Sequence, residues 1–293
     1  TVAALQADPS HELIYHALYS TLHEDMHTEA LTYTRQTHHW APPRLGVPFE
    51  AAGHGGPADG DVEVPGGTYP LGAQRDKPFV FDNEKWAHPV ELEPFRIARG
   101  AVTQGQYADF VDDGGYADER LWDEEGWTWR CEVNAEHPLH WQRSSDGWQR
   151  CHFDDLRPLE PHRPVIHVNW LEAQAYCRWA GRRLPTEAEW EAAAIGEAGG
   201  DGALAATKRV FPWGDEPLSP ERANLDWRAM ETVDVGALPA GDSNWGCRQM
   251  IGNVWEWTST TFAPFPGFVV DPYKDYSEPW FHTRKVMRGG CWT

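Results

Sequence analysis

Apolar residues recur at helical spacing along one long stretch near the start of the chain. Between Ser10 and about Thr37 they fall on one face of a helix, at Leu13, Ala17, Leu18, Leu22, Met26, Ala30 and Leu31. Ser10 or Asp8 is the expected N-terminal cap, with Pro9 at the entry, and the "APP" of residues 41–43 ends the helix. A helix of this length normally belongs to a bundle, yet no partner helices follow it. We therefore expect residues 1–43 to be the C-terminal part of a helical bundle that begins before residue 1.

The pattern changes after this helix. Residues 44–65 are rich in Gly, Pro and acidic side chains, which predicts a linker or a long surface loop. Beyond it, strand-like pieces at 66–72, 90–100 and 165–170 are separated by Gly and Pro. Helices are expected at 103–113 after Thr103, at 169–181 after Asn169, and over 184–194, where Thr186 and Glu189 form a capping box. Few helices among many loops predict an α+β domain of low regularity over residues 66–293.

The net charge and the cysteine content limit the classes of binding partner and indicate the cellular compartment. The 45 acidic residues outweigh the 25 basic ones and give a net charge of −20, which disfavours nucleic acid and anionic membranes. No apolar run approaches the roughly 20 residues needed to cross a bilayer. The five cysteines include no CxxC pair, so we expect reduced thiols and a cytoplasmic protein. The stretch between Cys131 and Cys151 predicts a Trp-rich hairpin.

The stretch "HEDMHTE", residues 23–29, carries the candidate chemistry. His23 and His27 lie one helical turn apart on the same face, so both imidazoles can bind one metal ion. Glu29 lies near that side and could accept the outer N–H of a ligating imidazole. Two other readings stay open: a chance spacing among 14 histidines, and a zinc-protease HExxH motif in which Glu24 is the general base.

Several motifs resemble known families. "GRRLPTEAEWEAAA" (181–194), "FPWGDE" (211–216), "GCRQMIGNVWEWTST" (246–260) and "VMRGGCW" (286–292) resemble the formylglycine-generating-enzyme-like fold, a relative of the C-type lectin fold. The helix through "HEDMHTEALTYTRQT" resembles the last helix of a DinB-like four-helix bundle. Together, and in this order, they resemble the ergothioneine sulfoxide synthases and their sister group, the selenoneine synthases.

This resemblance implies a mononuclear non-haem Fe(II) enzyme. Members use O2 to join a sulfur or selenium donor to C2 of the imidazole ring of hercynine, which is Nα-trimethylhistidine. His23 and His27 match two of the three iron ligands, and the third His is expected outside this chain. The implied partners are hercynine, a thiol or selenosugar donor, and O2. The donor-binding arginines and the hercynine-binding segment of the family are expected outside residues 1–293.

Two positions depart from the family pattern. Met26 stands where many members have a Gln that positions hercynine, and Met cannot donate that hydrogen bond. Phe265 aligns with the catalytic Tyr of one sulfur-using branch and lacks the phenol; Tyr273 or Tyr276 could supply it instead. A selenium donor is oxidised more easily than a thiol, so this departure favours the selenoneine synthases.

Two alternative functions are also compatible with the sequence. One is copper-dependent formylglycine generation, although Cys291 has no second cysteine near it in the sequence. The other is a non-catalytic, lectin-like binding module.

Overall fold

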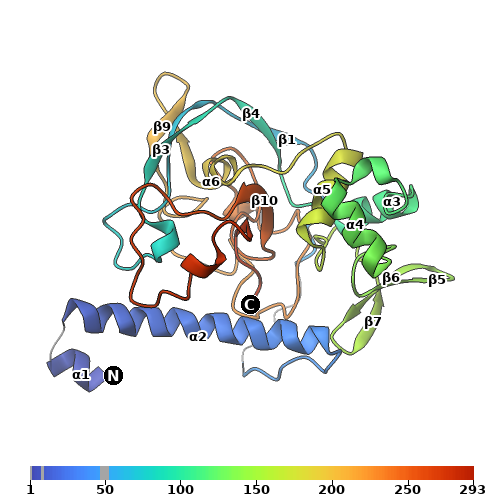
Figure 1. Cartoon of the computed structure of the whole chain (residues 1–293), viewed down its shortest axis with the longest axis horizontal. Helices are drawn as coiled ribbons and strands as arrows, with labels where there is room; N and C mark the ends of the chain where they lie inside the picture. The colour runs from blue at the N-terminus through green and yellow to red at the C-terminus, as the bar shows by residue number, and fades with distance from the viewer. Residues whose placement is uncertain (1, 8–9, 47–52) are drawn as a thin grey trace.

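A long helix lies against one side of the molecule in the computed structural model, which describes residues 2–7, 10–46 and 53–293 (Figure 1). It is α2 (His11–Thr37), preceded by the short α1 (Val2–Ala7). Ser10 caps α2, because its hydroxyl accepts a hydrogen bond from the backbone N–H of Leu13 at 3.3 Å. The predicted long helix and the Ser10 cap are confirmed, whereas Asp8 and Pro9 lie outside the described residues.

The partner of α2 is the rest of the chain. Among the described residues, α1 is the only other α-helix before residue 104, so the helical bundle stays a prediction. Figure 1 shows α2 running beneath the remaining elements, with the C-terminus beside its middle.

The rest of the chain contains small antiparallel sheets instead of one large sheet. The first two pair β1 (Asp61–Val64) with β4 (Phe95–Ala98), and β2 (Gly67–Leu71) with β3 (His88–Leu92). A three-stranded sheet follows, with order β5 (Trp141–Ser144), β6 (Gly147–His152) and β7 (Asp155–Pro158). The last two pair β8 (Gly196–Ala198) with β9 (Leu204–Lys208), and β10 (Glu256–Thr261) with β11 (Lys285–Arg288). The hairpin expected between Cys131 and Cys151 is β5–β6, and all five cysteines are free.

Four α-helices accompany the sheets. They are α3 (Gln104–Asp112), α4 (Glu124–Val133), α5 (Trp170–Trp179) and α6 (Glu187–Ile195). Single 3-10 turns lie at Asp82–Glu84, Glu119–Leu121, Pro239–Gly241 and Glu278–Trp280. Thr103, Asn169 and Thr186 each form a complete capping box, as their sequences predict. The helix α4 was not predicted. None of the described helices is long and apolar enough to cross a membrane.

Two expectations need correction. Residues 165–170 form no strand, because His167 has a left-handed backbone (φ 63°) that interrupts an extended run. The predicted linker, 44–65, is folded in the part that the structure describes from residue 53 onward. It contains β1, and the carboxylate of Asp234 accepts hydrogen bonds at 3.1 Å from the backbone N–H groups of Gly55 and Gly56. The sheet-bearing part therefore begins at Asp61 or earlier.

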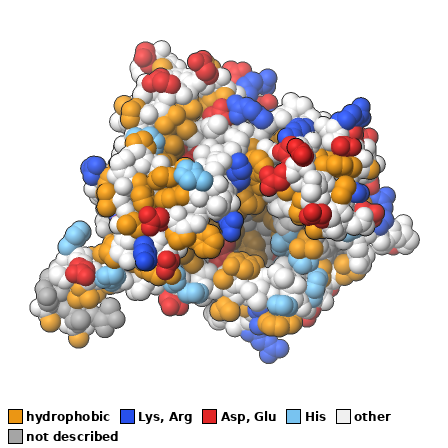
Figure 2. Space-filling model, viewed as in Figure 1, with side chains coloured by type: hydrophobic (Ala, Val, Ile, Leu, Met, Phe, Trp, Pro, Cys, Tyr) orange, Lys and Arg blue, Asp and Glu red, His pale blue; other side chains and the backbone are white. Residues whose placement is uncertain are grey.

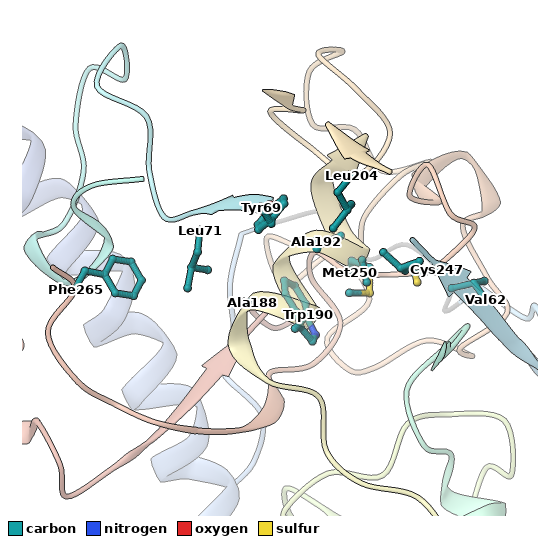
Figure 3. Packing of buried hydrophobic residues seen from close by; sticks show 13 residues of the cluster. Val62, Tyr69, Leu71, Ala188, Trp190, Ala192, Leu204, Cys247, Met250 and Phe265 are labelled. Atoms are coloured by element: carbon teal, nitrogen blue, oxygen red, sulfur yellow. The ribbon is translucent and has the colours of Figure 1, made fainter. Parts of the chain in front are cut away.

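The main hydrophobic core lies between α6 and the β1–β4 and β2–β3 sheets. Its buried members include Val64, Tyr69, Leu71, Trp190, Ala192, Met250 and Phe265 (Figure 3). A second cluster packs α3 against α5 around Tyr107, Phe110 and Tyr176. The helix α2 packs against this loop-rich body.

Candidate functional site

The paired histidines lie side by side on α2. The ring centroids of His23 and His27 are 4.6 Å apart, and the rings meet edge to face at 75°. His23 is half-buried and His27 is exposed. The two imidazoles therefore lie next to each other, as their i, i+4 spacing predicts. Their role as metal ligands stays a prediction. Met26, between them, is half-buried.

A ladder of rings continues this face toward the start of α2. Tyr15, Tyr19, His23 and His27 follow one another at i+4 spacing, with neighbouring centroids 6.0, 5.5 and 4.6 Å apart. The hydroxyl of Tyr19 lies 3.2 Å from Nδ1 of His23. Burial, and then the neighbouring Tyr273, raise the pKa of Tyr19 to about 12, so its side chain is a neutral phenol at physiological pH.

This contact can define which nitrogen of His23 is available. If Nδ1 carries the proton and donates it to the Tyr19 oxygen, Nε2 keeps a free lone pair. From the sequence, Glu29 was expected in this orienting role. Tyr19 was missed, although its i−4 position relative to His23 was a visible signal.

Glu29 makes different contacts from those expected. Its Oε1 accepts a hydrogen bond from the indole N–H of Trp255 at 2.8 Å and lies 3.3 Å from the thiol of Cys291. Six residues along a helix is a rotation of about 240°, which directs Glu29 away from His23 and toward the domain. Within the described part of the chain, no hydrogen bond joins Glu29 to either histidine.

Two more polar side chains of the same helix face attach α2 to the domain. Thr32 accepts a hydrogen bond from the indole of Trp227 at 3.1 Å. Gln36 donates to the backbone oxygen of Cys151 at 3.1 Å and accepts from the backbone N–H of Phe153 at 2.8 Å. These contacts hold the histidine pair in one position relative to the domain.

Phe265 does not lie at the histidine pair. Its side chain is 9% exposed within the main core, its ring packs edge to face on His88 at 4.6 Å, and Figure 3 shows it beside Leu71. The predicted contact of Phe265 with substrate finds no support in this position. The absent phenol therefore gives no argument about the donor.

Tyr273 occupies the place next to the histidines. Its ring centroid is 5.6 Å from that of His23 and 5.2 Å from that of Tyr19, and the residue is 43% exposed. Tyr276, from the same loop, stacks on Phe81 at 4.5 Å and is half-buried. Tyr273 is thus the accessible phenol at the histidine pair.

A cavity of about 770 Å³ opens between the C-terminal half of α2 and the domain. Figure 2 shows this face hollowed there, with hydrophobic side chains inside. Its wall contains Glu29, Tyr33, Arg150, His152, His167, Glu231, Thr232, Trp255, Glu256 and Trp292. The histidine pair is not part of this wall, since it lies on another side of α2. Burial raises the pKa of Glu256 to about 7, against the effect of a hydrogen bond from Trp190.

The two imidazoles fit part of a metal-ligand set. Neutral imidazole nitrogen suits iron, copper, nickel and zinc. Among the described residues, however, no group of three or more His, Cys, Asp or Glu side chains is arranged to hold a metal ion. As metal ligands the pair would supply two donor nitrogens, and the described residues place no third His, Cys, Asp or Glu side chain beside it to complete a site.

Comparison with known proteins shows which family the chain resembles. The sulfatase-modifying factor enzyme 1-like domain matches residues 49–293. A hercynine oxygenase of Mycolicibacterium smegmatis is 41% identical over 278 residues, which are 92% of this chain and 63% of that protein. The chain thus spans less than two thirds of that relative.

The chain is also similar to a second enzyme and to one solved structure. A formylglycine-generating enzyme of Streptomyces coelicolor is 32% identical over 268 residues, covering 80% of this chain and 78% of that enzyme. The solved structure of PvdO from Pseudomonas aeruginosa has a TM-score of 0.48 and 22% identity, covering 79% of this chain and 82% of that one.

Proposed function

Because the chain belongs to the sulfatase-modifying factor enzyme 1-like family, whose match covers residues 49–293, we propose that it is an oxidative enzyme acting on hercynine. The reaction is O2-dependent formation of a C–Se or C–S bond at C2 of the imidazole ring. The observation that carries this proposal is the adjacent His23–His27 pair on a helix held against the family's domain, together with the identity to a hercynine oxygenase.

His23 and His27 would hold Fe(II) through their neutral imidazoles. A ferrous ion supplies the activation of O2 and a site at which the reactants meet. Tyr19 orients the His23 ring through the 3.2 Å contact at Nδ1. Glu29, Thr32 and Gln36 fix the position of α2, so that orientation is set before the reactants bind.

Tyr273 would supply the phenol that the family uses in proton transfer. Its ring lies beside His23 and is partly exposed, so it is within reach of a substrate held at the histidine pair. Met26, on the same helix, would line the site with a soft thioether that cannot donate a hydrogen bond.

Steady-state kinetics separate the two classes of donor. Purified enzyme with hercynine, Fe(II) and O2 is offered a selenosugar or a thiol such as cysteine or γ-glutamylcysteine. Product formed with the selenosugar alone identifies a selenoneine synthase, and product formed with the thiols alone identifies a sulfoxide synthase. Absence of hercynine-dependent O2 consumption with either donor contradicts the proposed function.

Copper-dependent formylglycine generation is the second candidate, favoured by the 32% identity to the Streptomyces coelicolor enzyme. In the structure the Cys291 thiol contacts Glu29 and Thr293, at 3.3 and 3.0 Å. Among the described residues no other cysteine thiol contacts it. Copper binding that is lost in Cys291→Ser would favour this second function.

A further inference from the structure

The segment that carries Tyr273 is tied to the domain at both ends by one buried side chain. Asp82 opens the 3-10 turn Asp82–Glu84 and is 1% exposed. Its Oδ2 accepts a hydrogen bond from the backbone N–H of Asp271 at 3.1 Å, and its Oδ1 accepts one from the hydroxyl of Ser277 at 2.7 Å. Asp82 therefore joins the first and the last residue of segment 271–277.

An ion pair strengthens the first of these two ends. Nζ of Lys85 lies 2.7 and 2.8 Å from the two carboxylate oxygens of Asp271. Their side chains are only 20% and 16% exposed, so water and salt screen this pair less than a surface pair. Burial, and then the neighbouring Asp271, raise the pKa of the Tyr15 phenol on α2. Asp271 thus contacts both the turn of the domain and α2.

The middle of the segment directs its rings toward α2. Tyr276 stacks on Phe81, which lies immediately before the turn, and its backbone N–H donates to the backbone oxygen of Tyr273 at 3.3 Å. The Tyr273 ring meets the rings of His23 and Tyr19, at centroid distances of 5.6 and 5.2 Å. Ring contacts tolerate several orientations. The place of this phenol therefore depends on where the backbone of its segment is held.

We propose that Asp82 is a positioning residue, which holds the phenol of Tyr273 beside the His23–His27 pair by fixing both ends of segment 271–277. A carboxylate suits this task, because both of its oxygens accept hydrogen bonds, whereas a side-chain amide has one acceptor oxygen only. The use of the phenol in proton transfer rests on the proposed function. The anchoring of the segment does not.

Hydrogen exchange of the full chain, without metal, tests the anchoring. Asp82→Asn keeps the size of the side chain and replaces one acceptor by a donor, so one end of the segment is released. Amide exchange within 271–277 should become about ten-fold faster or more, whereas exchange in α6 (Glu187–Ile195) should not change. Ser277→Ala releases the last residue alone and should accelerate exchange in the same segment.

The matched control is Asp76→Asn, which should exchange like wild type. Asp76 precedes the same turn, but its side chain is 70% exposed and pairs only loosely with Lys77, at 3.9 Å. Unchanged exchange of segment 271–277 in both Asp82→Asn and Ser277→Ala overturns the proposal. Equal acceleration in the segment and in α6 also overturns it, because Asp82 would then stabilise the domain as a whole.

Kinetics test whether Asp82 acts through Tyr273. Asp82→Asn should lower the turnover number by about ten-fold or more, because a displaced group loses its alignment, and should leave KM for hercynine nearly unchanged. In Tyr273→Phe the same substitution should have no further effect, since the phenol is already absent. Equal losses in both backgrounds overturn the positioning role. Absence of hercynine-dependent turnover in wild type, with the exchange result as expected, overturns only the proposed function.

Discussion

The phenol of Tyr19 lies 3.2 Å from Nδ1 of His23, one turn away on α2. This contact links a buried ring, 8% exposed, to a candidate metal ligand at the surface of the helix. Removing the phenol oxygen in Tyr19→Phe frees the His23 ring to rotate and to change its tautomer. We expect metal affinity to fall about 10-fold or more, as measured by anaerobic Fe(II) or Co(II) titration. Tyr33→Phe, on the same helix, is the control, and equal loss in both variants would remove the special role of Tyr19.

Tyr273 is predicted to act in proton transfer. Tyr273→Phe keeps the ring beside His23 and Tyr19 and removes only the hydroxyl, so substrate binding should change little. The turnover number should fall by about 100-fold, the lower range for a general acid–base group, as followed by product formation under saturating hercynine. Tyr276→Phe is the matched control from the same loop, because its ring stacks on Phe81. Unchanged turnover in Tyr273→Phe would show that the phenol comes from another residue.

Gln36 is predicted to stabilise the attachment of α2. Gln36→Ala leaves the backbone N–H of Phe153 and the backbone oxygen of Cys151 without the partners that they have now. Because Phe153 is 1% exposed, the loss should cost about 1–3 kcal/mol of unfolding free energy, measured by urea denaturation. Thr37→Ala, at an exposed position of the same helix, should cost much less. Equal effects of the two substitutions would show that this contact contributes little.

Glu256 is predicted to make stability depend on pH. Burial raises the pKa of its carboxyl from 4.5 to about 7 in the folded protein, so the native state binds a proton that the unfolded state releases between these values. The contribution is fully present below pH 4.5 and is lost as the pH rises toward 7. Glu256→Gln should flatten this slope, with a difference from wild type of about 3 kcal/mol across the window. Parallel stability curves for both proteins would contradict the buried, protonated state.

The sequence predicted local features better than long-range ones. The caps at Thr103, Asn169 and Thr186 are decided by side chains within three residues, and all three were found. The helix α4 was missed because Gly126 and closely spaced tryptophans obscure its pattern. The strand expected at 165–170 failed because the left-handed backbone of His167 leaves no trace in hydrophobicity.

The same difference between local and long-range features holds for the candidate site. Adjacent rings at His23 and His27 follow from helix geometry alone, and the structure places them accordingly. The expected orientation of Glu29 was wrong. It lies six residues after His23 on the helix, and this rotation turns its side chain toward the domain and Trp255. Tyr273, Asp82 and the histidine pair come from segments far apart in the chain, and a pattern along the sequence cannot show which of them meet.

The most direct test of the central claim is anaerobic Fe(II) titration of the chain and of its His23→Ala and His27→Ala variants. His38→Ala, beyond the end of α2 and away from the pair, is the control. The account predicts that one ferrous ion binds the wild type and the control, and that either substitution in the pair abolishes this binding. Retention of one Fe(II) per chain in both variants would contradict it.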